Sequence, residues 1–381
     1  MKYVILIIHI LLLFPVCIFS NGKKEATLLF VGDAMQHSSQ IKAARKGDAY
    51  DYRNYFKYIQ DKISSADLSV VNFETTLGGK PYKGYPCFSA PDEYAQALKN
   101  AGFDLFLTAN NHCLDTGKKG LERTIFMLDS FQIDYTGTFA NKKEREKLYP
   151  KLLEINGIRI ALLNYTYDTN GIEAQNPNVV NYIDKPVMLE DINQAKALNA
   201  EIIIACIHWG EEYKLTQNNE QENLAEWMKE QGVRLIIGSH PHVVQPIRAE
   251  RDKEGYISNL TVYSLGNFVS GMIARNTDGG LMVEVRLSKK NQQIYVENVS
   301  YELLWRYRNK STGEIAIIPA SRAESLDLGE NKTRILSEMQ PFVNTAQEIF
   351  RKYNSDLSPP LRKLEYEITP FLFFPKNEMP F

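Results

Sequence analysis

The feature that most constrains this chain is a series of short apolar runs, each of which stops at a polar residue. The runs "LLFVG", "VVNF", "LFLTA", "IIIACI", "LIIGS" and "VYSLG" are rich in β-branched and aromatic residues and are shorter than a typical helix. They therefore predict buried β-strands. The residues that follow these runs are Asp33, Glu74, Asn110, Asn111, His112, His208, His240, His242 and Asn267.

Amphipathic stretches separate the apolar runs and predict helices. Apolar residues recur at helical spacing in residues 51–65 and 91–102, and the second stretch has Pro91 at its start and Gly102 at its end. The pair Asn156-Gly157 lies between two apolar runs and predicts a β-hairpin. The βαβα order, with antiparallel pieces later, predicts a layered α/β domain with a mixed sheet or two packed sheets.

The polar residues at the strand ends are expected to share one site, because parallel strands direct their carboxyl ends to one crevice. Imidazole, carboxylate and amide groups are ligands of zinc, manganese and iron. Two such ions can hold a phosphate and activate a water, while a neighbouring histidine protonates the leaving oxygen. Each residue alone also fits a helix cap or a turn, but four of the six histidines of the chain lie at these ends, which favours a shared site.

Composition narrows the class of protein. The 381 residues are 44% hydrophobic and 24% charged, which is typical of a globular chain long enough for a large core. The net charge of -2 gives no basic field for nucleic acid, so no nucleic-acid partner is expected. The sequence contains no G-x-S-x-G elbow, no P-loop and no C-x-x-C pair.

The N-terminus is typical of an export signal. Lys2 precedes an apolar run from Tyr3 to Phe19, and polar residues follow. Residues 1–22 are therefore interpreted as a signal peptide or a membrane anchor, and Cys17 is either a lipidation site or an ordinary apolar residue of the signal. The protein is expected to be exported to the periplasm or cell surface, or anchored through this segment.

Three cysteines remain beyond this segment, namely Cys87, Cys113 and Cys206. An odd number predicts a fold that does not depend on disulfides. Cys206 shares a strand face with His208, so it is either a soft metal ligand or a buried apolar residue. The sequence divides into residues 26–288, which form the site-bearing domain, and residues 289–381, a C-terminal extension packed on that domain or a small second module.

Six motifs together carry a family resemblance: "VGDAM", "NFETTL", "TANNHCLDTG", "IHWGEEY", "IIGSHPHVVQP" and "YSLGNF". In this order they closely resemble the CapA-type poly-gamma-glutamate capsule-synthesis family, of the calcineurin-like metallophosphoesterase superfamily. The resemblance covers about Thr27 to Phe268. It implies a four-layer α/β/β/α metallophosphoesterase-like sandwich, to which this chain adds the C-terminal extension.

The resemblance also implies roles for individual residues. Matched to the motifs of the superfamily, the implied metal ligands are Asp33, Glu74 as the bridging carboxylate, Asn111, His208, His240 and His242. His112 matches the general acid that faces the phosphate. The two histidines on either side of Pro241 would each serve one of two neighbouring ions.

This sequence departs from the superfamily pattern in three places. Met35 stands where the first motif usually has a histidine, so either His37 supplies the missing nitrogen or one metal is weakly held. Ser239 stands where the capsule family often has another histidine, and Thr75-Thr76 where a proline is frequent. These departures concern the number of metal ions more than the fold.

Residues near the motifs complete the expected site. Asp115 is expected to orient His112, although it also fits an ordinary turn carboxylate before Gly117. Trp209 and Tyr213 flank the turn after His208 and are expected to line a substrate groove, with aromatic packing as the alternative. The expected substrate-binding residues are Asn110, Trp209, Tyr213 and Asn267.

Three functions remain open at this point. The first is an exported hydrolase with one or two divalent ions (manganese, zinc or iron) that acts on a phosphoester or on an amide in a cell-envelope polymer. The second is a non-catalytic assembly or export factor that binds an anionic surface polymer, with membrane-bound capsule-synthesis machinery as a partner. The third is a binding module that uses Trp209, Tyr213 and the aromatic C-terminal tail.

Overall fold

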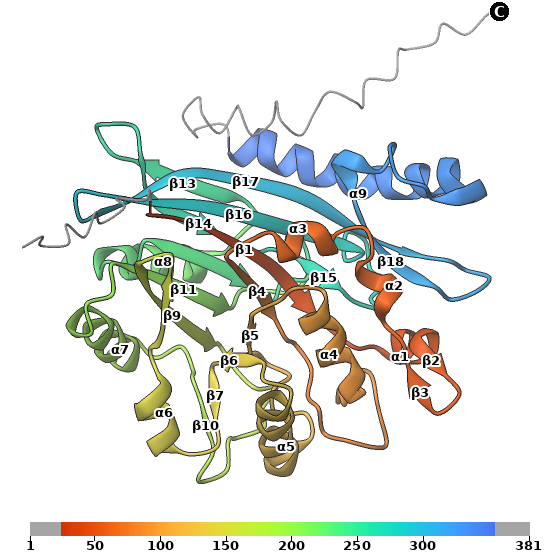
Figure 1. Ribbon diagram of the computed structural model, residues 1–381, viewed down its shortest axis with the longest axis horizontal. Coiled ribbons are helices and arrows are strands. Elements are labelled where there is room, and N and C mark those ends of the chain that lie inside the picture. The colour runs from red at the N-terminus through yellow and green to blue at the C-terminus, as the bar shows by residue number, and fades with distance from the viewer. Residues whose placement is uncertain (1–23, 355–381) are drawn as a thin grey trace, which may run out of the picture.

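The computed structural model describes residues 24–354. The expected signal or anchor segment with Cys17, and the aromatic tail, lie outside the described residues. A single 14-stranded sheet dominates the fold, and it is best understood as two halves that pack face to face (Figure 1).

The first half carries the N-terminal strands. It consists of β6 (Asp134–Thr136), β5 (Leu105–Leu107), β4 (Leu68–Asn72), β1 (Lys24–Ala34) and β16 (Gly279–Lys290). Strands β1, β4, β5 and β6 are parallel, whereas β16 is antiparallel to β1. The parallel strands therefore end at the same edge, as the sequence predicts for "LLFVG", "VVNF" and "LFLTA".

The second half carries the remaining apolar runs. It consists of β14 (Ile257–Val262), β12 (Leu235–Ser239), β11 (Ile202–His208), β9 (Ile158–Thr166) and β8 (Lys151–Ile155). Strands β9, β11, β12 and β14 are parallel. The predicted hairpin is confirmed, since β8 and β9 are antiparallel and both turn residues have positive φ, 49° at Asn156 and 75° at Gly157.

Long antiparallel strands join the two halves. β17 (Gln293–Arg308) pairs with β16 along its length and with β14 at Ile257. The remaining strands are β13 (Ile247–Arg251), β15 (Asn267–Val269) and β18 (Ile315–Pro319), and the short pairs β2 (Arg45–Lys46) with β3 (Ala49–Tyr50) and β7 (Thr138–Phe139) with β10 (Val179–Val180). The expected domain division at residue 288 falls within β16, close to this hairpin, and it stays a prediction.

Helices cover the outer face of each half (Figure 1). The helices are α1 (Ser38–Ala44), α2 (Arg53–Phe56), α3 (Gln60–Ser64), α4 (Asp92–Asn100), α5 (Gly117–Ser130), α6 (Lys142–Leu148), α7 (Lys185–Ala197), α8 (Asn219–Glu230), α9 (Lys332–Tyr353), and the 3₁₀ turns η1 (Ala320–Arg322) and η2 (Gly329–Asn331). Side chains of α2, α3 and α4 pack on the first half, and those of α7 and α8 on the second. The expected four-layer α/β/β/α sandwich is confirmed.

One predicted helix differs in detail. Residues 51–65 form the two short helices α2 and α3 rather than one continuous helix. The carbonyl of Tyr58, between them, accepts a hydrogen bond from the guanidinium of Arg322 at 2.9 Å. A long-range polar contact therefore occupies a carbonyl at the break.

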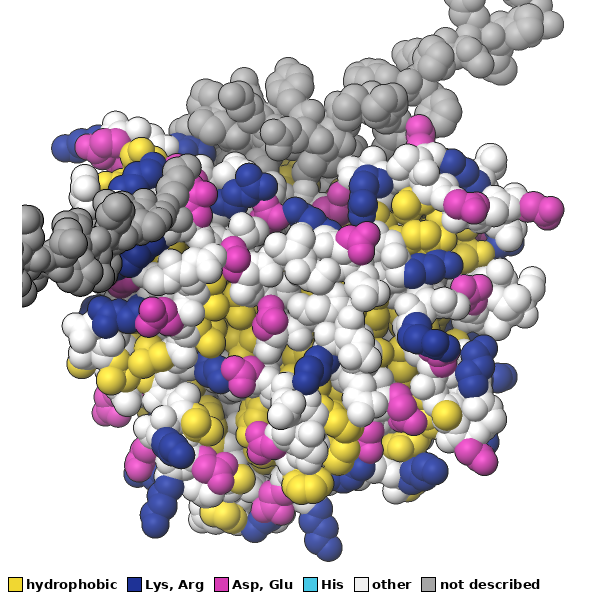
Figure 2. Space-filling view, viewed as in Figure 1, with side chains coloured by type: hydrophobic (Ala, Val, Ile, Leu, Met, Phe, Trp, Pro, Cys, Tyr) yellow, Lys and Arg dark blue, Asp and Glu magenta, His cyan; other side chains and the backbone are white. Residues whose placement is uncertain are grey.

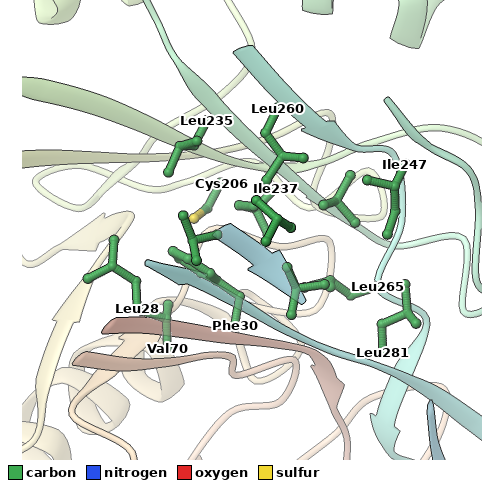
Figure 3. Close-up of a cluster of buried hydrophobic side chains, with 14 of the residues drawn as sticks. Leu28, Phe30, Val70, Cys206, Leu235, Ile237, Ile247, Leu260, Leu265 and Leu281 are labelled. Atoms are coloured by element: carbon green, nitrogen blue, oxygen red, sulfur yellow. The ribbon is translucent and has the colours of Figure 1, made fainter. Parts of the chain in front are cut away.

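The core between the two halves follows from the alternation of side chains along each strand. Leu28 and Phe30 of β1 lie in this inner core, whereas Leu29 and Val31 pack against the outer helices. The residues of the two halves that face each other in Figure 3 include Leu28, Phe30 and Val70 on one side and Leu235, Ile237 and Leu260 on the other. This arrangement holds the strand ends of the two halves at a fixed separation.

A truncation in the inner core should be costly. Phe30 is 1% exposed, and we expect Phe30→Ala to lower the free energy of unfolding by about 3–5 kcal/mol through lost burial and an unfilled cavity. Phe126 on α5 is 66% exposed, so Phe126→Ala should change it by no more than about 0.5 kcal/mol. Urea unfolding of the two variants beside the wild type checks this, and equal losses would contradict the assignment of the core.

The C-terminal part of the described chain packs on the sandwich. The apolar face of α9, including Met339, Phe342 and Phe350, joins the inner core beside β17 (Figure 1). Among residues 24–354, no helix has both the length and the apolar content that a bilayer span requires. Figure 2 shows acidic and basic side chains interspersed over the visible face, as the small net charge of -2 leads one to expect.

Candidate metal centre

Side chains from the ends of both half-sheets meet in one buried cluster. Asp33 ends β1, Glu74 follows β4, His208 ends β11, and His240 and His242 follow β12. All five are buried, and the ring centroids of His208 and His240 are 4.8 Å apart. The expected convergence of distant strand ends is therefore observed.

The first side of the cluster is organised by Asp33. Its Oδ1 accepts a hydrogen bond from the Asn72 side-chain amide at 2.8 Å, and its Oδ2 lies 3.1 Å from Nδ1 of His242. The same Nδ1 lies 3.1 Å from Oδ1 of Asn267, whose amide donates to the Thr277 carbonyl at 2.8 Å. The carboxylate and the Asn267 amide together fix the orientation of the His242 ring.

The second side of the cluster is organised by His208. Its Nε2 lies 2.9 Å from Oδ1 of Asn111 and 3.6 Å from Oε1 of Glu74. Its Nδ1 lies 3.3 Å from the Asn72 amide nitrogen that also contacts Asp33. Asn72 thus connects a carboxylate of one half-sheet with an imidazole of the other.

Glu74 occupies the centre of the cluster. It is 0% exposed, and neither carboxylate oxygen has a hydrogen-bond partner among the described residues. Its Oε1 also lies 3.9 Å from Nε2 of His242. A buried carboxylate without a donor is strongly disfavoured unless a cation or a proton compensates its charge.

Two groups of side chains have a geometry suited to a metal ion. Donor atoms of Asp33, Glu74 and His208 lie within 4.8 Å of one another, as do those of Glu74, His240 and His242. Glu74 belongs to both groups, so it could bridge two ions. The donor set of carboxylates, imidazoles and one amide suits divalent zinc, manganese or iron.

Burial sets the protonation of these groups. It raises the pKa of Glu74 well above its ordinary value, and the adjacent Asp33 carboxylate raises it further. Burial also lowers the pKa of His208 and of His240 well below the usual value, helped by the neighbouring histidines. Both imidazoles are therefore neutral near pH 7, which is the form that binds a metal.

The loop that carries the paired histidines has an unusual backbone. His240 has φ 99° and His242 has φ 59°, both in the left-handed region that side chains other than glycine rarely occupy. A Cβ on Gly238 would lie 2.0 Å from the Tyr263 carbonyl oxygen, so only glycine permits this close approach. Such strain persists where the surrounding structure enforces it, and here it directs both rings into the cluster.

His112 lies beside the cluster with a carboxylate partner. Its Nδ1 lies 2.8 Å from Oδ2 of Asp115, and that oxygen accepts a hydrogen bond from the Phe88 amide at 2.6 Å. The Phe88 ring packs edge-on against the His112 ring, with centroids 4.6 Å apart. The imidazole is thus held in one orientation through Nδ1, and Nε2 takes no part in this contact.

Several expected site residues lie elsewhere or are occupied by structural contacts. His37 caps the start of α1, and its Nδ1 accepts a hydrogen bond from the Gly271 amide at 3.1 Å; burial lowers its pKa to about 4. It belongs to neither donor group found among the described residues. The Asn110 side chain bonds the Phe73 carbonyl and the His112 amide, which fits a turn.

Trp209 and Cys206 are placed in the core. The Trp209 indole donates to the Tyr263 carbonyl at 2.9 Å and packs beneath α8, so its position does not support the expected groove. Cys206 lies in the inner core, where burial raises the pKa of its thiol. Tyr213 does lie at the site: its side chain is about half exposed and its ring centroid is 6.4 Å from that of His242.

The structure adds four residues that the sequence reasoning missed. They are Asn72, Tyr167, Asn170 and Glu212. The Tyr167 ring lies against His240 with centroids 4.5 Å apart, and the side-chain Oδ1 of Asn170 accepts a hydrogen bond from the side-chain amide of Asn111 at 3.2 Å. Tyr167 and Asn170 both follow β9. The expectation that polar residues at the ends of parallel strands share one site, applied to the run "IALLNYT", could therefore have found them.

Comparisons with known proteins give one family. The family model described as "Bacterial capsule synthesis protein PGA_cap" matches residues 27–272. A "Capsule biosynthesis protein CapA" of Bacillus anthracis is 31% identical over 277 residues, which covers 69% of this chain and 64% of that protein. A "PGA biosynthesis protein CapA" of Bacillus subtilis (strain 168) is 30% identical over 268 residues, covering 68% of this chain and 67% of the relative. The match thus spans slightly less than two thirds of the B. anthracis protein.

Solved structures that align with this chain are more distant from it in sequence than the relatives above. A calcineurin-like phosphoesterase YfkN from Bacillus subtilis aligns with a TM-score of 0.46 and 15% identity, covering 86% of this chain and 99% of that one. The NAD nucleotidase NadN of Haemophilus influenzae aligns with a TM-score of 0.45 and 14% identity, covering 88% of this chain and 60% of that one.

Proposed function

This chain belongs to the bacterial capsule synthesis protein PGA_cap family, and we propose that it is a metal-dependent hydrolase in the biosynthesis of a capsule or another anionic envelope polymer. The bond cleaved would be a phosphoester or an amide of that polymer. Export through residues 1–22 and contact with membrane-bound synthesis machinery are part of the same proposal.

The observation that carries the proposal is the environment of Glu74. Glu74 is a fully buried carboxylate whose two oxygens have no hydrogen-bond partner among the described residues, and it lies beside the imidazoles of His208, His240 and His242 and a second carboxylate, Asp33. One or two divalent ions would compensate this charge and bind the unpartnered oxygens of Glu74. The residues that would hold the ions are Asp33, Glu74, Asn111, His208, His240 and His242.

A bound divalent ion would supply Lewis-acid stabilisation to an anionic substrate oxygen. The protein residues would position the ligands of the ion. The Asn72 side chain contacts both Asp33 and His208 and so fixes their relative positions, and the Asn267 side-chain amide orients His242. Because the ligands come from both half-sheets, the sandwich itself fixes their separation.

Proton transfer is assigned to His112. The Asp115 carboxylate holds its Nδ1, so Nε2 could give a proton to a leaving oxygen or nitrogen. The Phe88 amide in turn donates a hydrogen bond to Asp115, which fixes that carboxylate beside His112. Tyr167 and Tyr213, both partly exposed, would contact the polymer on either side of the histidine pair.

The proposal is tested by metal content and hydrolysis together. Protein loaded with Mn²⁺ or Zn²⁺ is expected to retain at least one ion per chain after dialysis and to hydrolyse an aryl phosphate or phosphodiester. Chelation should remove the activity and re-addition of the ion should restore it. Elemental analysis and a colorimetric phosphatase assay measure both.

Two results would change this view. Protein that retains no ion after loading would overturn the proposed metal site. Protein that retains the ion but hydrolyses neither phosphoesters nor polymer amides would favour the alternative, in which the ion binds carboxylates of an anionic polymer during assembly or export.

A further inference from the structure

Glu212 is the carboxylate at the mouth of the cluster. It lies in the turn after β11, and its Oε1 is 4.0 Å from Nε2 of His242. The same nitrogen is 3.9 Å from Oε1 of Glu74. Since Nδ1 of His242 already contacts Asp33 and Asn267, Nε2 is the nitrogen that faces these two glutamates.

The turn that carries Glu212 is hydrogen-bonded to the loop that carries His240 and His242. The backbone amide of Tyr213 donates to the carbonyl of Pro241 at 2.9 Å, and Tyr213 has φ 66°, a conformation side chains rarely adopt. Gly210 has φ 85°, and a Cβ there would lie 2.7 Å from Cδ of Gln221. The turn is therefore specified by its own contacts, which place Glu212 opposite His242.

Unpartnered buried atoms point to a ligand at this position. Both oxygens of Glu74 and Nδ1 of His240 have no hydrogen-bond partner among residues 24–354, and the two residues are 0% and 3% exposed. They belong to the donor group that His242 completes. Glu212 thus faces a cluster whose unpartnered atoms could bind a cation.

The composition of the cluster leaves room for another hard donor. Met35 lies in the core at the end of β1, and a thioether is a soft ligand that hard divalent ions bind weakly. The cluster already contains the carboxylates of Asp33 and Glu74. A third carboxylate would further balance the positive charge of two divalent ions. Glu212 lies outside both donor groups, but its Oε1 is 4.0 Å from Nε2 of His242, so it is placed to supply this carboxylate.

We propose that Glu212 is a further metal ligand, which binds the ion held by Glu74, His240 and His242. The side chain of Glu212 is 42% exposed, so it is also the donor that an anionic group of a substrate can displace. This inference rests on the proposed function only in requiring that the cluster binds a divalent ion.

The test is metal affinity rather than activity. Mn²⁺ binding to the full chain, the Glu212→Gln variant and the Glu211→Gln variant is measured by isothermal titration calorimetry and by the electron paramagnetic resonance signal of free Mn²⁺. Glu211 is the matched control, because it is an exposed neighbouring carboxylate that accepts from Asn218 instead. Thermal unfolding in chelator shows that all three proteins are equally folded.

We expect Glu212→Gln to weaken the binding of one ion about 10- to 100-fold and Glu211→Gln to leave it within about twofold. Equal affinity of the wild type and Glu212→Gln would overturn the role of Glu212 while leaving the metal site intact. Absence of binding in the wild type would overturn the proposed function, and this inference with it.

Discussion

Glu74→Gln is expected to abolish tight binding of divalent ions and with it the stabilisation that an ion gives. Glu74 belongs to both groups of donor atoms, so its loss affects every ion the cluster could hold. At a free ion concentration 1,000 times the Kd, binding stabilises the wild type by about 4 kcal/mol. Thermal unfolding with and without Mn²⁺ should show this rise in Tm for the wild type and none for the variant.

The metal-free variant gives a second readout of the same prediction. Neither Glu74 oxygen has a hydrogen-bond partner within residues 24–354, so the isosteric amide removes no partner there and should not lower the stability of the metal-free protein. Glu284 is the matched control, a buried carboxylate that pairs with Lys62 and Arg286 away from the cluster. Glu284→Gln should lower Tm with or without ion and keep the ion-dependent rise. An ion-dependent rise that persists in Glu74→Gln would contradict the assignment.

His112→Ala should separate chemistry from metal binding. Its ring lies outside both donor groups, so the variant should keep the metal content of the wild type, while the loss of the Asp115 contact lowers its Tm. Loss of a positioned acid typically lowers kcat by about 10²- to 10⁴-fold. Steady-state hydrolysis and elemental analysis on the same preparation measure both quantities.

The partner residue provides a graded control. Asp115→Asn keeps the shape of the side chain but removes the charge that holds Nδ1 of His112, so its kcat should fall between those of the wild type and His112→Ala. Full hydrolytic activity in His112→Ala would exclude it as the proton donor. Capsule function that survives the change would support the non-catalytic alternative.

Much of the fold follows from local patterns. The run "IIIACI" and its counterparts were recognisable as strands because burial on both faces demands apolar side chains, and the Asn156-Gly157 turn because its backbone needs positive φ. Asp33 and the paired histidines His240 and His242 were also expected near one another, because they follow parallel strands and such strands direct their ends to one edge of the sheet. These properties depend on neighbours along the chain or on topology alone.

The contacts that define the site depend on how the two half-sheets face each other. Asn72 touches Asp33 and His208, residues far apart in the sequence, and Glu212 meets His242 through a turn whose path no periodicity describes. Trp209 stands next to His208 in sequence, yet its side chain points into the opposite layer, because successive side chains of a strand face opposite sides.

The sequence by itself therefore determined the main buried strands, the helix within residues 91–102 and the polar residues that end the strands. The tertiary structure alone decided which of those residues meet in one buried cluster, that Glu74 has no hydrogen-bond partner in the described part of the chain, and that His37 caps a helix. The physical reason is range: periodicity and turn chemistry act between near neighbours, whereas side-chain contacts across the sandwich arise from packing between strands distant in the chain.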